Sequence, residues 1–153
     1  MAPAPPPGAD GSGDDIDSDD VDSDDVEELA TRLFTMARQG DADVLDAYVA
    51  AGVPVDLRNQ SGDSLVMLAA YHGHAGVVEV LLARGADPDL PNDKGQTPLA
   101  GAVFKGEDDV VDALLAGGAD PRAGQPTAVA TAAMFGRTDH LERFGETPSP
   151  DDA

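Results

Sequence analysis

The feature that most constrains this chain is a sequence unit that returns at a fixed interval of 33 residues. The segment LLARGADP at residues 81–88 recurs as LLAGGADP at residues 114–121, with Gly117 in place of Arg84. Glycines keep the same interval in three sets: Gly40, Gly73 and Gly106; Gly52, Gly85 and Gly118; Gly62 and Gly95. A fixed period between about 20 and 50 residues is typical of stacked arrays, in which each unit packs against its neighbours.

The first half of each unit reads as a short helix. SLVMLAAYHG at residues 64–73 corresponds to TPLAGAVFKG at residues 97–106. In the later copy Thr97 can cap the helix with its hydroxyl group, and Pro98 suits the first helical position because its missing N–H group would have no helical partner. Ser64 can provide the same cap in the earlier copy. The pattern therefore predicts one helix in each segment.

The second half of each unit carries an apolar stripe at helical spacing. It reads VVEVLLARGADP at residues 77–88 and VVDALLAGGADP at residues 110–121, and a glycine follows each stripe where a helix can end. One such unit cannot bury its own stripe, whereas a row of units can. We therefore expect Leu82, Leu115 and their neighbours to stack layer on layer, and replacing either leucine by alanine to cost about 2–5 kcal/mol.

The two central units resemble the ankyrin repeat. The residues that carry this resemblance are SGDSLVMLAAYHGHAGVVEVLLARGADP at 61–88 and KGQTPLAGAVFKGEDDVVDALLAGGADP at 94–121. The resemblance implies an all-α solenoid of about four helix–turn–helix units with short hairpin-like loops. Weaker copies on both sides would complete the stack, because terminal repeats usually depart from the consensus and seal its ends. We expect the units at about 29–60, 61–93, 94–123 and 124–144.

Segments of different composition flank the predicted repeat domain, which spans residues 26–144. Residues 1–25 are rich in Pro, Gly and Asp, and nine Asp and two Glu lie between Asp10 and Glu28 without any Lys or Arg. A segment of this kind has little apolar surface to bury and repels itself, so we expect residues 1–25 and 145–153 to be disordered. We also hypothesise that the acidic segment folds across basic residues of the repeat domain and competes with a partner.

The charge of the chain argues against two classes of partner. Its 153 residues hold 30 acidic and 9 basic side chains, which gives a net charge of −21. Nucleic acids and anionic membranes attract cationic surfaces, so we expect neither as a partner. No apolar run reaches the roughly 18 residues that a membrane span needs, and the N-terminus lacks the apolar core of a signal peptide. We therefore expect a monomeric, cytoplasmic protein.

Metal-binding and catalytic motifs are incomplete in this sequence. The chain has no Cys, and His72 and His74 lie far from His140 in the sequence. The acidic run that starts at Asp15 lacks the Gly and the Glu that a calcium-binding loop needs at its sixth and twelfth positions. We expect no catalytic residue, no metal site and no cofactor. The resemblance implies a structural hydrogen bond for His74, and it leaves His72 open to line a binding face.

The resemblance also implies where a partner would bind, because ankyrin repeats usually meet partners with their loop tips and the exposed side of the first helix. These positions map onto Arg38, Tyr71, His72, Phe104, Lys105 and Phe135 on the helices, and onto Arg58, Gln60, Asp63, Asp93, Lys94 and Gln96 at the loops. Both lysines of the chain and a row of aromatic residues fall on this face, which is typical of a protein interface. The alternative is that Tyr71 and Phe104 only pack against neighbouring loops.

These features predict a non-enzymatic interaction module. The main interpretation is an adaptor that binds another protein through the concave face of the repeat stack. The alternative is a regulator or inhibitor that uses its acidic surface or tail to mask a basic site on an enzyme or a nucleic-acid-binding protein. Salt would weaken binding of the second kind strongly, because exposed charges are screened beyond about 10 Å at 0.1 M ionic strength.

Overall fold

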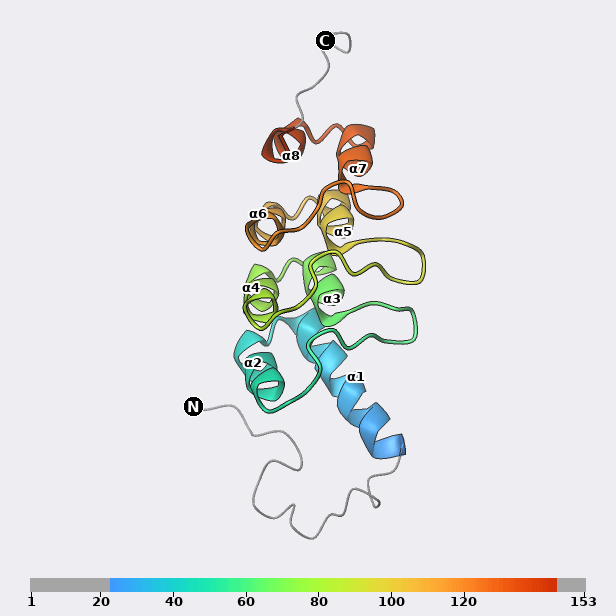
Figure 1. Ribbon diagram of the computed structural model, residues 1–153, viewed down its shortest axis with the longest axis vertical. Helices are drawn as coiled ribbons and strands as arrows, with labels where there is room; N and C mark the ends of the chain where they lie inside the picture. The colour runs from blue at the N-terminus through green and yellow to red at the C-terminus, as the bar shows by residue number, and fades with distance from the viewer. Residues whose placement is uncertain (1–22, 146–153) are drawn as a thin grey trace.

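The computed structural model describes residues 23–145, which form eight helices arranged as four stacked pairs (Figure 1). The first helices of the pairs make an inner row, which contains α1 (Ser23–Gln39), α3 (Leu65–Tyr71), α5 (Pro98–Lys105) and α7 (Ala128–Met134). The second helices make an outer row, which contains α2 (Ala42–Ala50), α4 (Ala75–Ala83), α6 (Asp108–Ala116) and α8 (Thr138–Arg143). The expected all-α solenoid of helical pairs is therefore confirmed.

Loops that project beside the inner row join each pair to the next (Figure 1). Within residues 23–145, the only β-type pairing is an isolated antiparallel bridge between Arg58 and Ser64. No helix in this part of the chain is long and apolar enough to cross a membrane. The segments expected to be disordered, 1–25 and 145–153, lie outside the described residues except at their inner ends, where α1 begins at Ser23.

Local signals explain where the inner helices begin and end. The hydroxyl groups of Ser64, Thr97 and Thr127 each accept a hydrogen bond from the backbone N–H group three residues later. Pro98 occupies the start of α5, as expected from its fixed backbone angle. Gly106 ends α5 with φ 73° and ψ 30°, a left-handed conformation that glycine adopts without a steric penalty. These interactions span only a few residues, so the local sequence specifies them.

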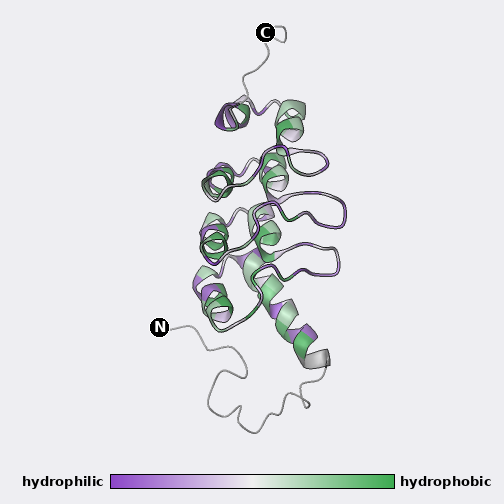
Figure 2. Ribbon diagram, viewed as in Figure 1, coloured by the Kyte–Doolittle hydropathy of each residue, from purple (hydrophilic) through white to green (hydrophobic). Residues whose placement is uncertain are grey.

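The core is formed by apolar residues of both rows of helices, and Figure 2 shows the hydrophobic stretches of these helices. Leu81 in α4 and Leu114 in α6 are 0% exposed, whereas their neighbours Leu82 and Leu115 are only partly buried. Leu82, Leu115 and their neighbours were expected to stack together, and all four leucines contribute to the core, but the two that are fully buried are the neighbours Leu81 and Leu114. The apolar stripe contains two adjacent leucines, and the rotation of the helix in the stack decides which one faces the inner row.

Leu82 has a different role, which explains the one difference between the two repeated segments. A Cβ atom placed on Gly117 would lie 2.5 Å from Leu82 Cδ1, so the leucine of one repeat packs on the glycine of the next. Arg84, the counterpart of Gly117, instead extends to Asp46 of the preceding repeat, with 2.8 Å between Nε and Oδ1. The exchange of arginine for glycine thus follows from what each neighbouring repeat presents.

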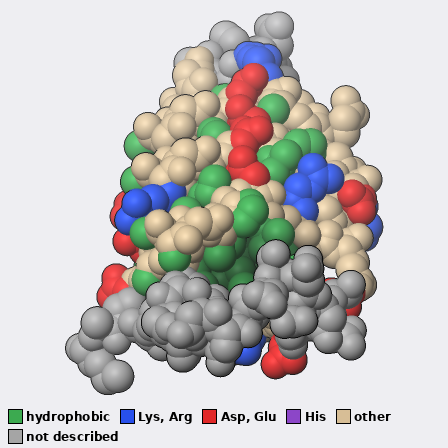
Figure 3. All heavy atoms as spheres, turned by 60° about the horizontal axis from the view of Figure 1, so that its bottom comes forward, with side chains coloured by type: hydrophobic (Ala, Val, Ile, Leu, Met, Phe, Trp, Pro, Cys, Tyr) green, Lys and Arg blue, Asp and Glu red, His purple; other side chains and the backbone are tan. Residues whose placement is uncertain are grey.

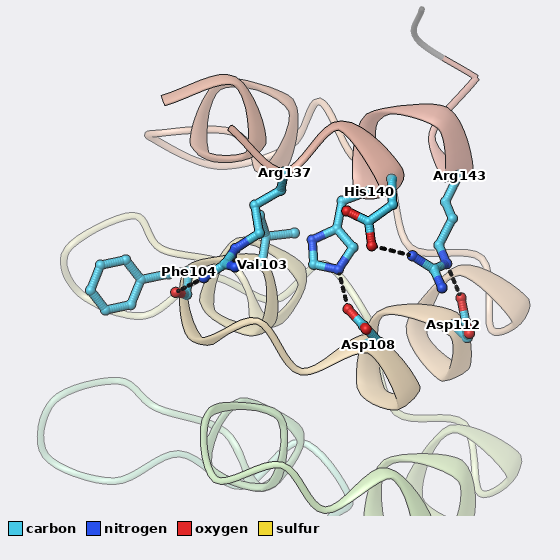
Figure 4. A network of polar contacts seen from close by, with 8 residues as sticks. Val103, Phe104, Asp108, Asp112, Arg137, His140 and Arg143 are labelled. Carbon is cyan, nitrogen blue, oxygen red and sulfur yellow. Dashed lines mark hydrogen bonds and ion pairs between the residues drawn. The ribbon is translucent and has the colours of Figure 1, made fainter. Parts of the chain in front are cut away.

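Side chains that follow the inner helices α3 and α7 connect the second repeat to the first and the fourth repeat to the third. His74 Nε2 donates to the backbone oxygen of Arg38 at 2.7 Å, which confirms the structural hydrogen bond expected for this histidine. Arg137 Nε donates to the oxygen of Val103 at 2.9 Å, and a second guanidinium nitrogen donates to the oxygen of Phe104 at 3.2 Å (Figure 4). Carbonyl groups at helix C-termini lack helical partners, so these donors stabilise the ends of α1 and α5.

Candidate interaction groove

A groove of about 890 Å³ runs between the inner helices and the loops of the second, third and fourth repeats. One wall is formed by loop residues 60–63 and 92–96, and the opposite wall by side chains of α3, α5 and α7. The groove is therefore a composite of three repeats, and it exists only when they are stacked. Figure 3 shows hydrophobic side chains gathered on one face of the molecule, with basic side chains on two sides of them and an acidic stripe above.

The groove brings together eight of the residues that were expected to bind a partner. They are Gln60, Asp63, Tyr71, Asp93, Lys94, Gln96, Phe104 and Phe135. The other four expected residues do not line it, and they are Arg38, Arg58, His72 and Lys105.

Sequence reasoning missed most of the groove floor. Met67, Leu68, Gly101 and Thr131 line the groove, yet none was among the expected site residues. A simple signal identifies them, because they lie three or four residues before the aromatic positions on the same helix face. The expectation covered the exposed end of each inner helix and stopped one turn short of the groove centre.

Aromatic and basic side chains form a ladder along the C-terminal ends of the inner helices. The rings of Phe104 and Phe135 meet edge to face, with 5.2 Å between their centroids. Lys105 Nζ lies 4.8 Å from the centroid of the Tyr71 ring, which is within the range of a cation–π interaction. Despite these contacts, Tyr71 is 38% exposed, Phe104 48% and Phe135 47%. The three rings therefore contact neighbouring repeats and still present apolar surface to solvent.

The charges on this face are unevenly paired. Arg58 lies 3.7 Å from Asp93, and Asp63 Oδ1 accepts a hydrogen bond from Asn92 Nδ2 at 2.9 Å. In contrast, no ion pair within residues 23–145 involves Arg38, Lys94 or Lys105. Asp93 is thus paired with a cation and Asp63 with a neutral amide, whereas three cations of this face have no acidic partner in this part of the chain.

His72 lies among these cations. Partial burial lowers the pKa of His72, and the neighbouring cations Arg38 and Lys105 lower it further. Its ordinary value is about 6.5, so the imidazole is neutral at pH 7 and can both donate and accept a hydrogen bond. Tyr71 contacts the same ring edge to face, with 5.7 Å between the centroids.

Hydrogen bonds hold the loop wall of the groove in place. Asn92 Oδ1 accepts from the backbone N–H groups of Lys94 and Gln96, each at 3.0 Å. Asn59 Oδ1 makes the same pair of contacts in the preceding loop. The N–H group of Asp93 donates to the oxygen of Ser61 at 3.0 Å, which connects the two loops. A wall ordered in this way loses little further conformational entropy when a ligand binds.

A separate polar cluster joins the last repeat to the third. His140 is buried, and its Nε2 donates to Asp108 Oδ1 at 2.6 Å (Figure 4). Arg143 Nε lies 2.7 Å from Asp112, and a second nitrogen of Arg143 lies 3.3 Å from Asp139. Asp108, Asp139 and His140 are close enough to share a metal ion. Each of the acids already contacts a cation or a ring N–H group, so the geometry is that of a contact between α6 and α8.

Comparison with known proteins agrees with this architecture. A family model described as ankyrin repeats in three copies matches residues 33–125. An ankyrin repeat protein of Pseudomonas aeruginosa is 52% identical over 46 residues, a stretch that covers 30% of this chain and 27% of the relative. This chain therefore matches about a quarter of that protein's length. Because the family model covers more than half of the chain, and the helical pairs stack as it requires, the chain belongs to the ankyrin repeat family.

Proposed function

We propose that this protein is an interaction module or adaptor that binds another protein through the groove and does no chemistry of its own. Ankyrin repeats generally act as protein–protein interaction modules, and both comparisons point to this family. One observation carries the proposal for this particular face, namely the ladder of Tyr71, Phe104 and Phe135, which lines the groove and stays exposed. Aromatic anchors beside a concave surface are typical of the residues that dominate binding energy.

The proposed contact residues have two kinds of role. The eight that line the groove, including Tyr71 and Phe104, would be covered by the partner. Arg38, Arg58, His72 and Lys105 lie beside the groove and would meet the partner at its rim. Charges at a rim mainly affect the association rate and the orientation of the partner, whereas buried aromatic anchors determine most of the affinity.

Affinity capture from the native host tests this proposal. The bait is the full-length chain, and the test variant combines Tyr71→Ala with Phe104→Ala. Each side chain is more than one-third exposed, so the double variant should keep its fold, as far-UV circular dichroism would check. Loss of two interface anchors should weaken binding of the captured partner at least about tenfold.

Val26→Ala provides the control for this experiment. Val26 is an exposed apolar residue in α1, and it does not line the groove. The control should bind the partner as the unchanged protein does. A double variant that binds as tightly as the control would show that the groove is not the binding face.

A second candidate function follows from the charge of the chain. The net charge is −21, and Figure 3 shows acidic side chains in a stripe across one face. A regulator could use such a surface to cover a basic site on an enzyme or a nucleic-acid-binding protein. Binding of that kind should weaken steeply as salt rises and should be insensitive to Tyr71→Ala and Phe104→Ala, whereas groove binding should be lost when these two rings are removed.

A further inference from the structure

Gly101 leaves a gap in the floor of the groove. It lies in α5 at the position that corresponds to Leu68 in α3 and Thr131 in α7, and all three residues line the groove. A Cβ atom at Gly101 would lie 3.5 Å from Met67 Cε and 3.6 Å from Tyr71 Cδ1. The repeats on both sides thus carry side chains at this position, whereas the third repeat has a hollow with apolar walls. We call this hollow the Gly101 notch.

The backbone does not require glycine at this position. Gly101 lies inside α5 and is not among the glycines with positive φ. A glycine inside a helix costs about 1 kcal/mol relative to alanine. The distances to Met67 and Tyr71 show that an alanine methyl group would make ordinary van der Waals contacts. Neither local conformation nor packing explains the glycine, and exceptions of this kind concentrate at functional sites.

The charges around the notch indicate what would sit in it. Lys94 is exposed on the loop wall of the groove, and Lys105 lies over Tyr71, which forms one wall of the notch. Neither lysine has an ion pair within the described residues. Asp63 and Asp93 of the same groove already have partners in Asn92 and Arg58. The four cations in or beside the groove, which are Arg38, Arg58, Lys94 and Lys105, outnumber the two acids that line it. The local charge is therefore positive on a chain whose net charge is −21, and it is complementary to an acidic ligand.

We propose that the Gly101 notch receives one aliphatic side chain of an extended partner segment whose neighbouring residues are acidic. The inference rests on the proposed function and specifies the chemistry of the partner. The aliphatic side chain is buried against Met67 and Tyr71, and the adjacent carboxylates lie beside Lys94 and Lys105. The notch determines which residue the partner places at the groove centre. The lysines determine the charge of the partner residues on either side of it.

Three synthetic peptides test this proposal on the full-length protein by nuclear magnetic resonance. The first is Gly-Asp-Asp-Leu-Asp-Asp-Gly, the second replaces Leu by Ala, and the third replaces every Asp by Lys. The first peptide should shift the amide signals of Gly101, Tyr71 and Phe104, and it should bind about tenfold more tightly than the alanine peptide. Equal affinities for the first two peptides, shifts at these amides with the lysine peptide, or no shift at Gly101 with the first peptide would overturn the proposal.

A matched pair of variants separates the notch from helix stability. Gly76 in α4 is exposed, has no positive φ, and would place an added Cβ atom more than 4 Å from any neighbour. Gly76→Ala and Gly101→Ala should therefore raise the melting temperature by similar amounts. Only Gly101→Ala should weaken binding of the leucine peptide, by about fourfold, because the added methyl group of the protein takes the place of one buried carbon of the ligand. Equal effects of the two variants on binding would contradict the notch.

Two further outcomes distinguish the notch from the wider function. If binding of the captured partner is lost in the double variant Tyr71→Ala with Phe104→Ala but is unaffected by Gly101→Ala, the notch proposal fails and the proposed function stands. If neither change affects the partner, both fail. If replacing the aspartates of residues 14–22 by asparagine shifts the Gly101 amide without any peptide, the chain's own acidic segment occupies the notch, and the assignment to a partner protein is wrong.

Discussion

Leu81 and Leu82 are neighbours in α4, and replacing each by alanine tests how the helix is rotated in the stack. Leu81 is 0% exposed, so Leu81→Ala removes a fully buried side chain and leaves a cavity between the helix rows. Such a change costs about 3–5 kcal/mol. Leu82 is only partly buried and rests on Gly117, so Leu82→Ala should cost roughly half as much, about 1–2 kcal/mol. Both changes have the same effect on helix propensity, which cancels in the comparison.

Urea unfolding followed by far-UV circular dichroism measures the free energy of unfolding that each of the two variants loses. A domain of this size is stable by about 5–15 kcal/mol, so Leu81→Ala should remove a large fraction of the free energy of unfolding and leave the dependence on urea unchanged. Leu114→Ala and Leu115→Ala repeat the comparison one unit later, where Leu114 is also 0% exposed. A larger loss for Leu82→Ala than for Leu81→Ala would refute the rotation of α4 described above.

Two further predictions concern polar contacts between repeats. Arg137→Ala removes the hydrogen bonds to the carbonyl oxygens of Val103 and Phe104, and it should lower the free energy of urea unfolding by about 1.5–3 kcal/mol; an unchanged value would contradict a structural role. Burial raises the pKa of Asp89, although its hydrogen bond from the Asp120 N–H group partly offsets this effect. Ionised Asp89 therefore opposes folding at neutral pH, and Asp89→Asn, which keeps the accepting oxygen, should raise stability at pH 7 by under about 1 kcal/mol, because the group is partly solvated. The stability gained by Asp89→Asn should shrink as pH falls through the raised pKa. A gain that grows on acidification would show that the pKa of Asp89 is lowered and not raised.

The helices and their ends could be predicted because the interactions that define them are local. Thr97 caps α5 through the N–H group three residues later, and Gly106 ends it through its own backbone conformation. Each signal acts within one helical turn, so it is visible in a single repeat. The fixed interval then extends the same assignment along the chain, which predicts a stack of helical pairs before any tertiary contact is known.

Part of the candidate site could be predicted for the same reason. Tyr71 and Phe104 occupy equivalent positions in successive repeats, so their alignment along one face follows from the period. The floor of the groove was missed, although Gly101 and Thr131 lie one turn before the aromatic positions. From the sequence, a glycine in a helical segment indicates only a lower helix propensity. It forms a notch only because Met67 and Tyr71 of the neighbouring repeat provide the walls.

The sequence by itself determined the repeat, the two helices of each unit and the face on which the exposed aromatic residues lie, because periodicity and capping depend on neighbours along the chain. Only the tertiary structure decided that Leu81 rather than Leu82 is fully buried, that Arg137 reaches the end of α5, and that Gly101 forms a notch. These features join residues about one repeat apart. They depend on the rotation and spacing of adjacent units, which local sequence does not encode.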